Sequence, residues 1–568
     1  MPSSGQFTLL AQRRFAPFFW TQFLGAANDN VFKYAFTLLV TYKAADYSTL
    51  TPALAVNLIA ALFVLPFLLF SATSGQLADK YDKARLMRLV KLFEVAIMLG
   101  GAWGFWAQRF DVLLACTFLM GLHSTLFGPV KYAYLPQALT PTEIVAGNGL
   151  VEMGTFVAIL IGTMAAGALI DASPAGNVYA AAVCVALALA GLATSLAIPS
   201  APPSDRKLAV DWNPIRVTWR NVQVARRDRA VFLSVLGISW LWFFGAIFLT
   251  QFPQLAQHTL RGDPAVATLL LAVFSIGIGA GSLACDRMSR HQVEIGLVPF
   301  GSIGMSVFTV DLYFAARDLP ASAPFTASQF VAIPAHWRVL LDLFLIALFA
   351  GFYSVPLYAL IQTRSEATHR ARIIASNNIL NAVFLILAAG FAALALGPLG
   401  LSTPQLFLLT ALLNVLVAVY IYTLVPEFLL RFLSWLLVSV FYRLDKNGTE
   451  RIPAEGAPLI VANHVSFVDA LVLMAVSPRP IRFVIPFAPG GATDIVTRML
   501  GPKLSERLGQ QVVPDNRAGA AGNIAVDIVA MAQPDGYTAL VGNIFTNSIN
   551  PILFAGRMKS NALKDLQG

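Results

Sequence analysis

The chain has 568 residues, of which 57% are hydrophobic and only 12% are charged. Soluble proteins are about 45–50% apolar and about 25% charged, so this composition excludes an ordinary soluble fold and favours a protein surrounded by membrane lipid. The net charge of +9 comes from basic residues between apolar segments, where membrane topology places them. We therefore expect no nucleic-acid partner.

The three cysteines, Cys116, Cys184 and Cys285, lie far apart in apolar runs. Their spacing fits neither a disulfide framework nor a zinc site, so we expect buried free thiols and no metal. The sequence shows no phosphate-binding loop, and we expect neither direct use of ATP nor any other cofactor. No signal-peptide cleavage pattern follows the N-terminus.

About twelve segments have the roughly 20 apolar residues that a membrane-spanning helix needs, which predicts an all-α polytopic membrane protein. The first six segments run near residues 16–42, 52–74, 86–107, 112–134, 144–170 and 177–198. The second six run near residues 231–256, 263–285, 294–316, 338–361, 372–396 and 403–425. This pattern predicts an N-terminal six-helix half at 1–200, a basic linker at 201–230 and a C-terminal six-helix half at 231–426.

Basic residues recur in the connections that share one side of the membrane if the helices alternate in direction. They are Arg13, Arg14, Lys80, Lys83, Arg85, Arg88, Lys91, seven residues of the linker, Arg364, Arg370 and Arg372. The positive-inside rule assigns this side to the cytoplasm. We expect a protein of the bacterial inner membrane with both termini in the cytoplasm.

Two segments carry an internal repeat. The fifth reads IVAGNGLVE from Ile144 to Glu152, and the eleventh reads IIASNNILN from Ile373 to Asn381, which aligns Asn148 with Asn377. Such a match requires six helices to repeat in the same orientation, as in transporters of the major facilitator type. The alternative is chance similarity between apolar strings.

The connection between the second and third segments reads GQLADKYDKAR from Gly75 to Arg85. It resembles the signature Gly-x-x-x-Asp-Arg/Lys-x-Gly-x-Arg/Lys of the major facilitator superfamily. The matching positions are Gly75, Asp79, Lys80, Lys83 and Arg85, whereas Asp82 replaces the usual glycine. We expect a gate in which the aspartate pairs with basic groups; the alternative is an ordinary charged loop.

Polar and ionisable side chains occur inside several segments, where each costs several kcal/mol unless it is paired or hydrated. They are Asp29, Asn30, Lys33, Lys131, Asn148, Glu152, Asn377, Asn378 and Asn381. Asp29 and Lys33 are four residues apart, so they share a helix face and could neutralise each other. We expect a polar, substrate-binding cavity; the alternative is hydrogen bonding that only holds the helices together.

The strings QFLGAANDN, GPVKYAYLPQAL, VAGNGLVEMGTFVAILIG and GFYSVPLYALIQ resemble the lysophospholipid transporter branch of that superfamily, over about residues 15–425. The resemblance implies movement of lysophosphatidylethanolamine and lysophosphatidylglycerol to the inner leaflet by alternating access. Lys131 would then bind the phosphate and Asp29 or Glu152 the ammonium. A generic exporter of the same fold is the alternative.

Residues 427–445 predict an interfacial helix, although a short hairpin or a thirteenth span would also fit. In residues 446–485, Asn463, His464 and Asp469 resemble the first block of glycerolipid acyltransferases. The resemblance implies that His464 accepts a proton from a glycerol hydroxyl, that Asp469 orients it, and that acyl-CoA or acyl carrier protein is the acyl donor. The later Phe-Pro-Glu-Gly-Thr block is missing, so we expect an inactive enzyme; an acyltransferase with a transporter-like anchor is the alternative.

The sequence changes character near residue 486. Residues 486–568 resemble the start of the periplasmic receptors of tripartite tricarboxylate transporters, with Gly490, Gly491, Thr493 and Asp494 opening a helix whose amides could bind a carboxylate. Such receptors are exported, whereas this segment is expected in the cytoplasm. We interpret the change as a chimeric join, either natural or introduced during sequence assembly.

Overall fold

The computed structural model describes residues 6–42, 50–171, 175–289, 293–294, 296–317 and 325–424, together with short stretches between 484 and 554. The chain forms two compact units, Met1–Phe428 and Leu429–Gly568. The predicted segments 427–445 and 446–485, including His464 and Asp469, lie outside the described residues apart from Val484–Ile485.

Twelve long helices form the described part of the first unit, as the sequence predicts. The N-terminal half contains α1 (Ala16–Tyr42), α3 (Pro52–Lys80), α4 (Lys83–Trp106), α5 (Phe110–Ala138), α6 (Ile144–Asp171) and α7 (Gly176–Leu196). The C-terminal half contains α9 (Arg229–Gln254), α10 (Pro264–Met288), α11 (Leu297–Arg317), α13 (Trp337–Arg364), α14 (Arg370–Leu396) and α15 (Thr403–Leu424). Short helices add η1 (Gln6–Ala11), α8 (Pro214–Ala225), η2 (Leu255–Thr259), α12 (Ala327–Ala332) and η3 (Pro334–His336).

Ten of these helices are long and apolar enough to cross a membrane, the exceptions among the twelve being α1 and α15. In α1 the polar run from Asn28 to Asn30, with Lys33 one turn later, lowers the hydropathy of a 27-residue helix. In α15 the apolar stretch Thr403–Val419 is shorter than the others. Polar residues in a helix of membrane-spanning length indicate a helix that faces other protein or water rather than lipid.

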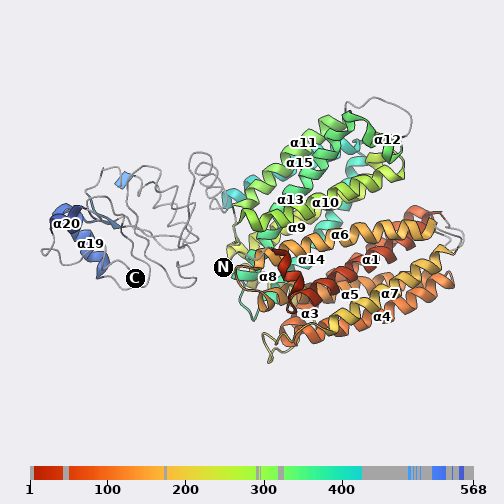
Figure 1. Ribbon diagram of the computed structural model, residues 1–568, viewed down its shortest axis with the longest axis horizontal. Coiled ribbons are helices and arrows are strands. Elements are labelled where there is room, and N and C mark those ends of the chain that lie inside the picture. Colours follow the sequence, from red (N-terminus) through yellow and green to blue (C-terminus); the bar gives the residue numbers. More distant parts are fainter. Residues whose placement is uncertain are drawn as a thin grey trace. The chain divides into compact units, whose positions relative to one another are not determined.

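The two halves repeat the same packing, which supports the internal repeat seen in the sequence. In the N-terminal half α1 packs on α6, α3 on α5, and α4 on α7; in the C-terminal half α9 packs on α14, α10 on α13, and α11 on α15. Further contacts join the halves; the most extensive are α3 with α14 and α6 with α10, and α5 and α6 also contact α13 or α14. Figure 1 shows the bundles meeting near α8 and diverging toward the end that carries α12.

We call the end where the halves meet the basic end, because the predicted basic connections gather there. The helices α3, α5, α10 and α13 end at it, while α6 and α14 begin at it. The linker also lies there, since Gln76 Nε2 donates to the Asp211 carbonyl and the Asp211 amide donates back to Gln76 Oε1, both at 2.9 Å. One assignment was wrong: Lys91 lies buried inside α4, because Asp82 caps that helix and starts it at Lys83.

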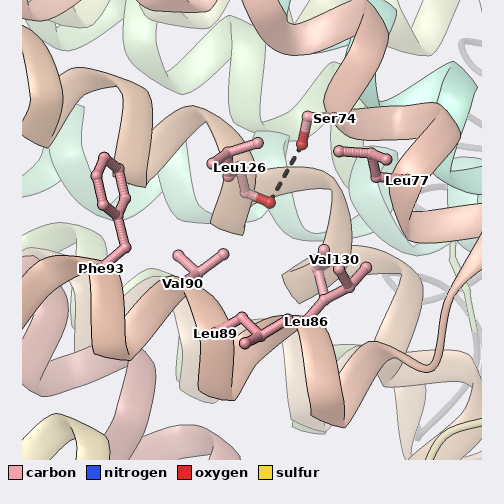
Figure 2. Close-up of a pocket in the computed structure, with 8 residues that line it drawn as sticks. All are labelled: Ser74, Leu77, Leu86, Leu89, Val90, Phe93, Leu126 and Val130. Carbon is pink, nitrogen blue, oxygen red and sulfur yellow. Dashed lines mark hydrogen bonds between the residues drawn. The ribbon is translucent and has the colours of Figure 1, made fainter.

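An open apolar groove of about 190 Å³ lies between α3, α4 and α5. Figure 2 shows its lining, in which the Ser74 hydroxyl donates to the Leu126 carbonyl at 3.1 Å and so presents no free polar group. The lining residues are Ser74, Leu77, Leu86, Leu89, Val90, Phe93, Leu126 and Val130.

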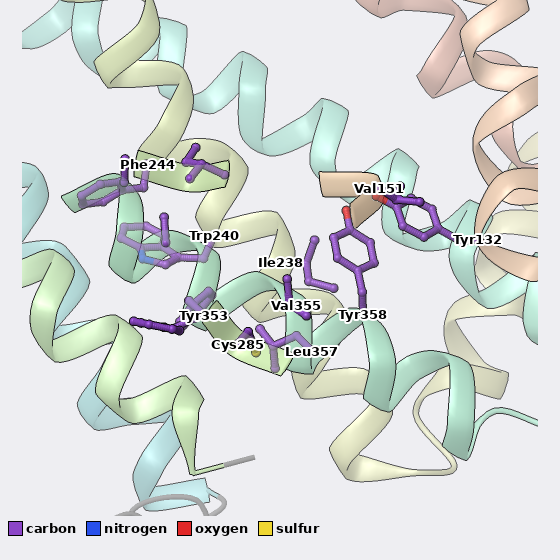
Figure 3. Packing of buried hydrophobic residues seen from close by; sticks show 14 of the residues in the cluster. Tyr132, Val151, Ile238, Trp240, Phe244, Cys285, Tyr353, Val355, Leu357 and Tyr358 are labelled. Carbon is purple, nitrogen blue, oxygen red and sulfur yellow. The ribbon is translucent and has the colours of Figure 1, made fainter. Parts of the chain in front are cut away.

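The largest core cluster runs through both halves. Figure 3 shows Tyr132 and Val151 of the N-terminal half beside Tyr358 of the C-terminal half. Cys116, Cys184 and Cys285 are buried and free, as expected.

In the second unit, β1 (Val484–Ile485) pairs in parallel with β2 (Asp515–Asn516), and helices α19 (Asn523–Ala530) and α20 (Asn550–Leu553) follow. Asp494 joins the two strand ends: its Oδ2 accepts from the Gly490 amide and its Oδ1 from Asn516 Nδ2, both at 2.8 Å. The Gly490 amide, predicted to bind a ligand carboxylate, is therefore occupied by Asp494. Gly491 and Thr493 lie outside the described residues.

Candidate functional site

A buried ion pair joins the halves at the basic end. Arg372 Nε, in the first turn of α14, lies 3.0 Å from Asp79 Oδ2 at the end of α3, and the Ala371 amide donates to Asp79 Oδ1 at 3.4 Å. The side chains are 8% and 0% exposed. A Cβ added to Gly75 would lie 2.7 Å from Ala375 Cβ, so only glycine allows α3 to approach α14 this closely. The predicted gating motif thus reaches its partner on the other half.

The remaining motif residues act within the N-terminal half. Lys83 Nζ lies 3.1 Å from Ser204 Oγ in the segment after α7, whereas the Lys80 ammonium lies over the Tyr81 ring and the Arg85 side chain is exposed. Among the gating residues, these three make no ion pair within the described part of the chain.

Asp82, the departure from the family signature, has a structural role. Its Oδ1 caps α4 by accepting from the Arg85 amide at 2.9 Å, and its Oδ2 accepts from Ser200 Oγ at 2.6 Å and from the Ala201 amide at 3.0 Å. Partial burial alone raises the pKa of the Asp82 carboxyl, but the hydrogen bonds from Ser200 and the backbone amides bring it below its ordinary value. The carboxylate therefore anchors the segment after α7 to the start of α4.

A second polar contact between the halves involves a residue that the sequence did not single out. Asn148 Nδ2 donates to Gln362 Oε1 at 2.7 Å, and Gln362 Nε2 donates to Asn148 Oδ1 at 3.0 Å. Both residues are fully buried, so this reciprocal pair satisfies two amides that would be costly to leave unpaired. Asn148 thus joins α6 to α13.

Two stacked tyrosines lie where α5 meets α13. The Tyr132 and Tyr358 rings are 4.4 Å apart between centroids and inclined by 5° (Figure 3). The Tyr132 hydroxyl donates to Glu152 Oε1 at 2.8 Å, which orients this predicted site residue. Lys131 has weaker contacts, since Nζ lies 3.4 Å from Gln22 Oε1 and 3.3 Å from Thr155 Oγ1. Its ammonium contacts neutral oxygens and also interacts electrostatically with Glu152, although among the described residues it makes no ion pair.

The predicted asparagines of α14 form a network across the C-terminal half. The Asn381 side-chain oxygen accepts from Asn377 Nδ2 and Trp242 Nε1, each at 3.2 Å. The Asn381 side-chain nitrogen donates to Ser239 Oγ at 2.9 Å. Asn377 also hydrogen-bonds with the Tyr358 hydroxyl. Asn378 packs against α5, where a Cβ on Gly128 would lie 2.6 Å from its Nδ2.

The polar residues of α1 point to different neighbours. Asp29 Oδ2 accepts from Ser124 Oγ at 2.6 Å, Asn30 donates to its own helix at the Ala26 carbonyl, and the Lys33 ammonium lies 4.6 Å from the centre of the Phe63 ring. The predicted neutralisation of Asp29 by Lys33 is absent from the described ion pairs, because each side chain has another partner. All three residues of this polar face are partly exposed.

A buried charge cluster, which the sequence analysis missed, lies behind that face. Lys91 Nζ is 2.6 Å from Glu94 Oε2, Asn28 Nδ2 donates to Glu94 Oε1 at 2.7 Å, and His123 Nε2 is 3.3 Å from Glu94 Oε2. All four side chains are almost fully buried. The available signal was Lys91 and Glu94 three residues apart within an apolar helix, which places both on one face.

Residues 18–328, more than half of the chain, match the model of the Major Facilitator Superfamily. The chain belongs to this superfamily. Residues 496–568 match the model of the tripartite tricarboxylate transporter family receptor.

Several curated relatives of this major facilitator protein are lysophospholipid transporters named LplT. The one from Enterobacter sp. strain 638 is 29% identical over 380 residues, which cover 66% of this chain and 86% of that protein. The one from Cronobacter sakazakii is 30% identical over 393 residues with the same coverage, and the one from Escherichia fergusonii is 28% identical over 410 residues, covering 68% and 91%.

Solved major facilitator structures share the fold. A bacterial homologue of the iron transporter ferroportin in an outward-facing state aligns with a TM-score of 0.54 at 13% identity, covering 72% of this chain and 100% of that chain. The proton:xylose symporter XylE aligns with a TM-score of 0.54 at 14% identity, covering 75% and 97%. At these identities the likeness shows the architecture alone.

Proposed function

We propose that this chain moves lysophospholipids across the bacterial inner membrane by alternating access. The similarity to LplT proteins along both halves carries the proposal. The parallel repeat supports it, because two equivalent bundles that rock about a central site are the expected machinery of such transporters.

The proposed resting state is closed at the basic end. Asp79–Arg372, Asn148–Gln362 and the stacked tyrosines all join the halves in the part of each helix nearest that end, while the bundles diverge toward the other end (Figure 1). If the basic end is cytoplasmic, as the positive-inside rule requires, this state would give access to the proposed site from the outer side. Opening toward the cytoplasm then has to break these three contacts.

The proposed head-group site combines polar residues of α1, α5, α6 and α14. Lys131 would bind the phosphate, because in the described part of the chain its ammonium hydrogen-bonds to neutral oxygens alone, at 3.3–3.4 Å. Asp29 or Glu152 would bind an ammonium; Glu152 already accepts from Tyr132, whereas Asp29 is partly exposed on the polar face of α1. Asn377 and Asn381 would complete the polar lining from the C-terminal half.

Uptake of labelled lysophosphatidylethanolamine into spheroplasts tests the proposal. We expect Lys131→Ala and Asp29→Ala to lower the initial rate at least tenfold, because each removes the charge proposed to bind the head group. Arg109→Ala is the matched control, since this exposed cation pairs with the neighbouring Asp111 and lies far from the site. Unchanged uptake in both site variants would refute the assignment.

The same assay separates the alternatives. A generic exporter would leave lysolipid uptake at background while a small cationic dye is still expelled. An acyltransferase with a transporter-like anchor would convert lysolipid to diacyl phospholipid, with acyl-CoA or acyl carrier protein as donor and His464 and Asp469 required. Uptake without diacyl product favours the transporter.

A further inference from the structure

The linker helix α8 packs across the seam between the two halves. It contacts α3 of the N-terminal half and α14 of the C-terminal half, and Val217 is buried against Ala72 and Ile379. Ala72 and Ile379 each lie a little more than two turns, about 12 Å, from the end of their helix at the basic end. Because α3 has 29 residues and spans about 44 Å, whereas the hydrocarbon core is about 30 Å thick, this contact lies near the boundary between hydrocarbon and head groups.

The outward face of α8 is divided into an apolar edge and a basic edge. Ile215 and Trp219 are one turn apart and, with Trp212 just before the helix, form the apolar edge; these side chains are 82%, 60% and 73% exposed. Arg216 and Arg220 are also one turn apart and form the basic edge beside it, where both are exposed. An apolar edge next to a basic one is typical of a helix that lies in the plane of the membrane interface.

The apolar edge continues the lipid-facing surface of the bundle. Leu69 lies one turn from Ala72 on α3, and Val383 lies one turn from Ile379 on α14; both Leu69 and Val383 are exposed on helices of membrane-spanning length. Three large apolar side chains exposed on so short a segment would be costly in water. Tryptophan is also the side chain that membrane–water interfaces favour. Lipid is therefore the occupant that fits this edge.

The charge of the linker indicates which lipid. Residues 201–230 contain seven basic and three acidic residues, a net charge of +4. Asp211 pairs with Arg216 at 2.7 Å and also interacts electrostatically with Arg220, but one carboxylate offsets only one of these charges. Basic residues next to a membrane strengthen binding to anionic lipids, and the planar guanidinium of arginine matches a phosphate. A nucleic acid would match the charge but not the exposed tryptophans.

We propose that α8 and Trp212 form a lipid-binding surface that holds the linker on the membrane and selects anionic phospholipid. The apolar edge enters the acyl region, and the basic edge binds the phosphates above it. This surface is separate from the proposed head-group site, so the inference does not depend on which substrate is transported. The linker is thereby anchored over the seam of α3 and α14, the two helices that carry the Asp79–Arg372 pair.

Spin labelling measures whether the apolar edge enters the membrane. Full-length protein with a nitroxide on Ile215→Cys is reconstituted into vesicles of equal parts phosphatidylcholine and phosphatidylglycerol. The native cysteines are buried, and unsubstituted protein treated in parallel gives the background labelling. We expect oxygen, which concentrates in lipid, to relax this nitroxide more than a water-soluble nickel chelate does. Trp219→Cys on the same edge should behave alike, whereas Gln223→Cys, exposed beside the basic edge, is the matched control and should give the opposite order.

Fluorescence quenching measures the choice of lipid. A fluorophore on Gln223→Cys is quenched by phosphatidylglycerol or phosphatidylcholine that carries a nitroxide near its head group, each added to phosphatidylcholine vesicles in equal trace amounts. We expect stronger quenching by the phosphatidylglycerol. Arg220→Gln should reduce this preference about fivefold, because each basic residue near the surface strengthens binding to anionic lipid by about this factor. Arg109→Gln removes an exposed cation elsewhere and should leave the preference unchanged.

Three results would overturn the inference. Stronger relaxation of the Ile215→Cys and Trp219→Cys nitroxides by nickel than by oxygen would show that the apolar edge faces water. Weak relaxation by both reagents would show that protein, such as a second copy of the chain, covers it. Equal quenching by the two lipids would exclude a preference for anionic phospholipid. None of these results bears on lysophospholipid uptake, so the proposed function is tested separately.

Discussion

Asp79→Asn tests whether the buried pair with Arg372 holds the basic end closed. Removing one partner of a buried pair costs about 3–5 kcal/mol, because the other charge is left uncompensated. In this variant Arg372 would still donate to the Thr368 carbonyl and lie 4.0 Å from the Asp205 carboxylate. We therefore expect a cost at the lower end of this range, about 3 kcal/mol. The equilibrium between the closed and open basic end should therefore shift about 100-fold toward the open state, since about 1.4 kcal/mol corresponds to a factor of ten.

Labelling of a reporter cysteine measures this shift. Ser282 is buried in α10 where that helix packs closely on α6, since a Cβ added to Gly149 would lie 2.5 Å from the Ser282 carbonyl oxygen. Cysteine is nearly isosteric with serine, and we expect the thiol of Ser282→Cys to become accessible when the basic end opens. The maleimide reaction of Ser282→Cys should accelerate about 100-fold in the Asp79→Asn background. Asp111→Asn, which breaks an exposed pair, is the control and should have no effect. A rate within threefold of the parent would show that the pair does not hold the gate.

Two further predictions concern stability. Gly25→Ala should lower the free energy of unfolding in detergent by about 1–3 kcal/mol, because the added Cβ would lie 2.3 Å from Lys91 Nζ. Gly167→Ala is the control and should have no effect, since nothing lies within 4 Å of its added Cβ. Equal effects of the two substitutions would contradict the packing argument. Asp82→Asn should destabilise the protein at neutral pH, because the carboxylate binds Ser200 and two amides. The pKa of Asp82 is lowered by folding, so its contribution is present above the unfolded value of about 3.9 and is lost as pH falls through the folded one. Melting curves should therefore converge in acid, and a constant difference from pH 7 to 3 would refute this.

The long helices were predictable because length and hydropathy are local properties of the chain. The predicted edges fall within six residues of the observed ones, even for α1 with its polar run from Asn28 to Asn30. The gating motif was predictable for the same reason: Gly75 and Asp79 stand in a local pattern. Their partners, Ala375 and Arg372, follow only from the packing of α3 on α14.

What the sequence could not show are partners supplied by distant helices. Lys91 was grouped with the basic residues of a connection, but it lies inside α4, where Glu94 and His123 of α5 are its partners. Such partners lower the cost of a lysine inside a membrane helix. Gln362 and Tyr358 lie in an apolar stretch of α13 that gives no local sign of their partners. Their partners, Asn148 and Tyr132, are supplied by the other half. Local patterns identify the polar residues of a membrane bundle, but not which of them meet.

The hydrogen bonds of the linker set how far the halves can separate. Residues up to Asp211 are held to the N-terminal half through Gln76, Asp82 and Lys83, and the C-terminal half begins with α9 at Arg229. The spacer between the halves is therefore mainly α8, 12 residues that span about 18 Å at about 1.5 Å per residue. A stiff tether of this length keeps each half at a high effective concentration for the other, so the gate recloses as an intramolecular event without a long search.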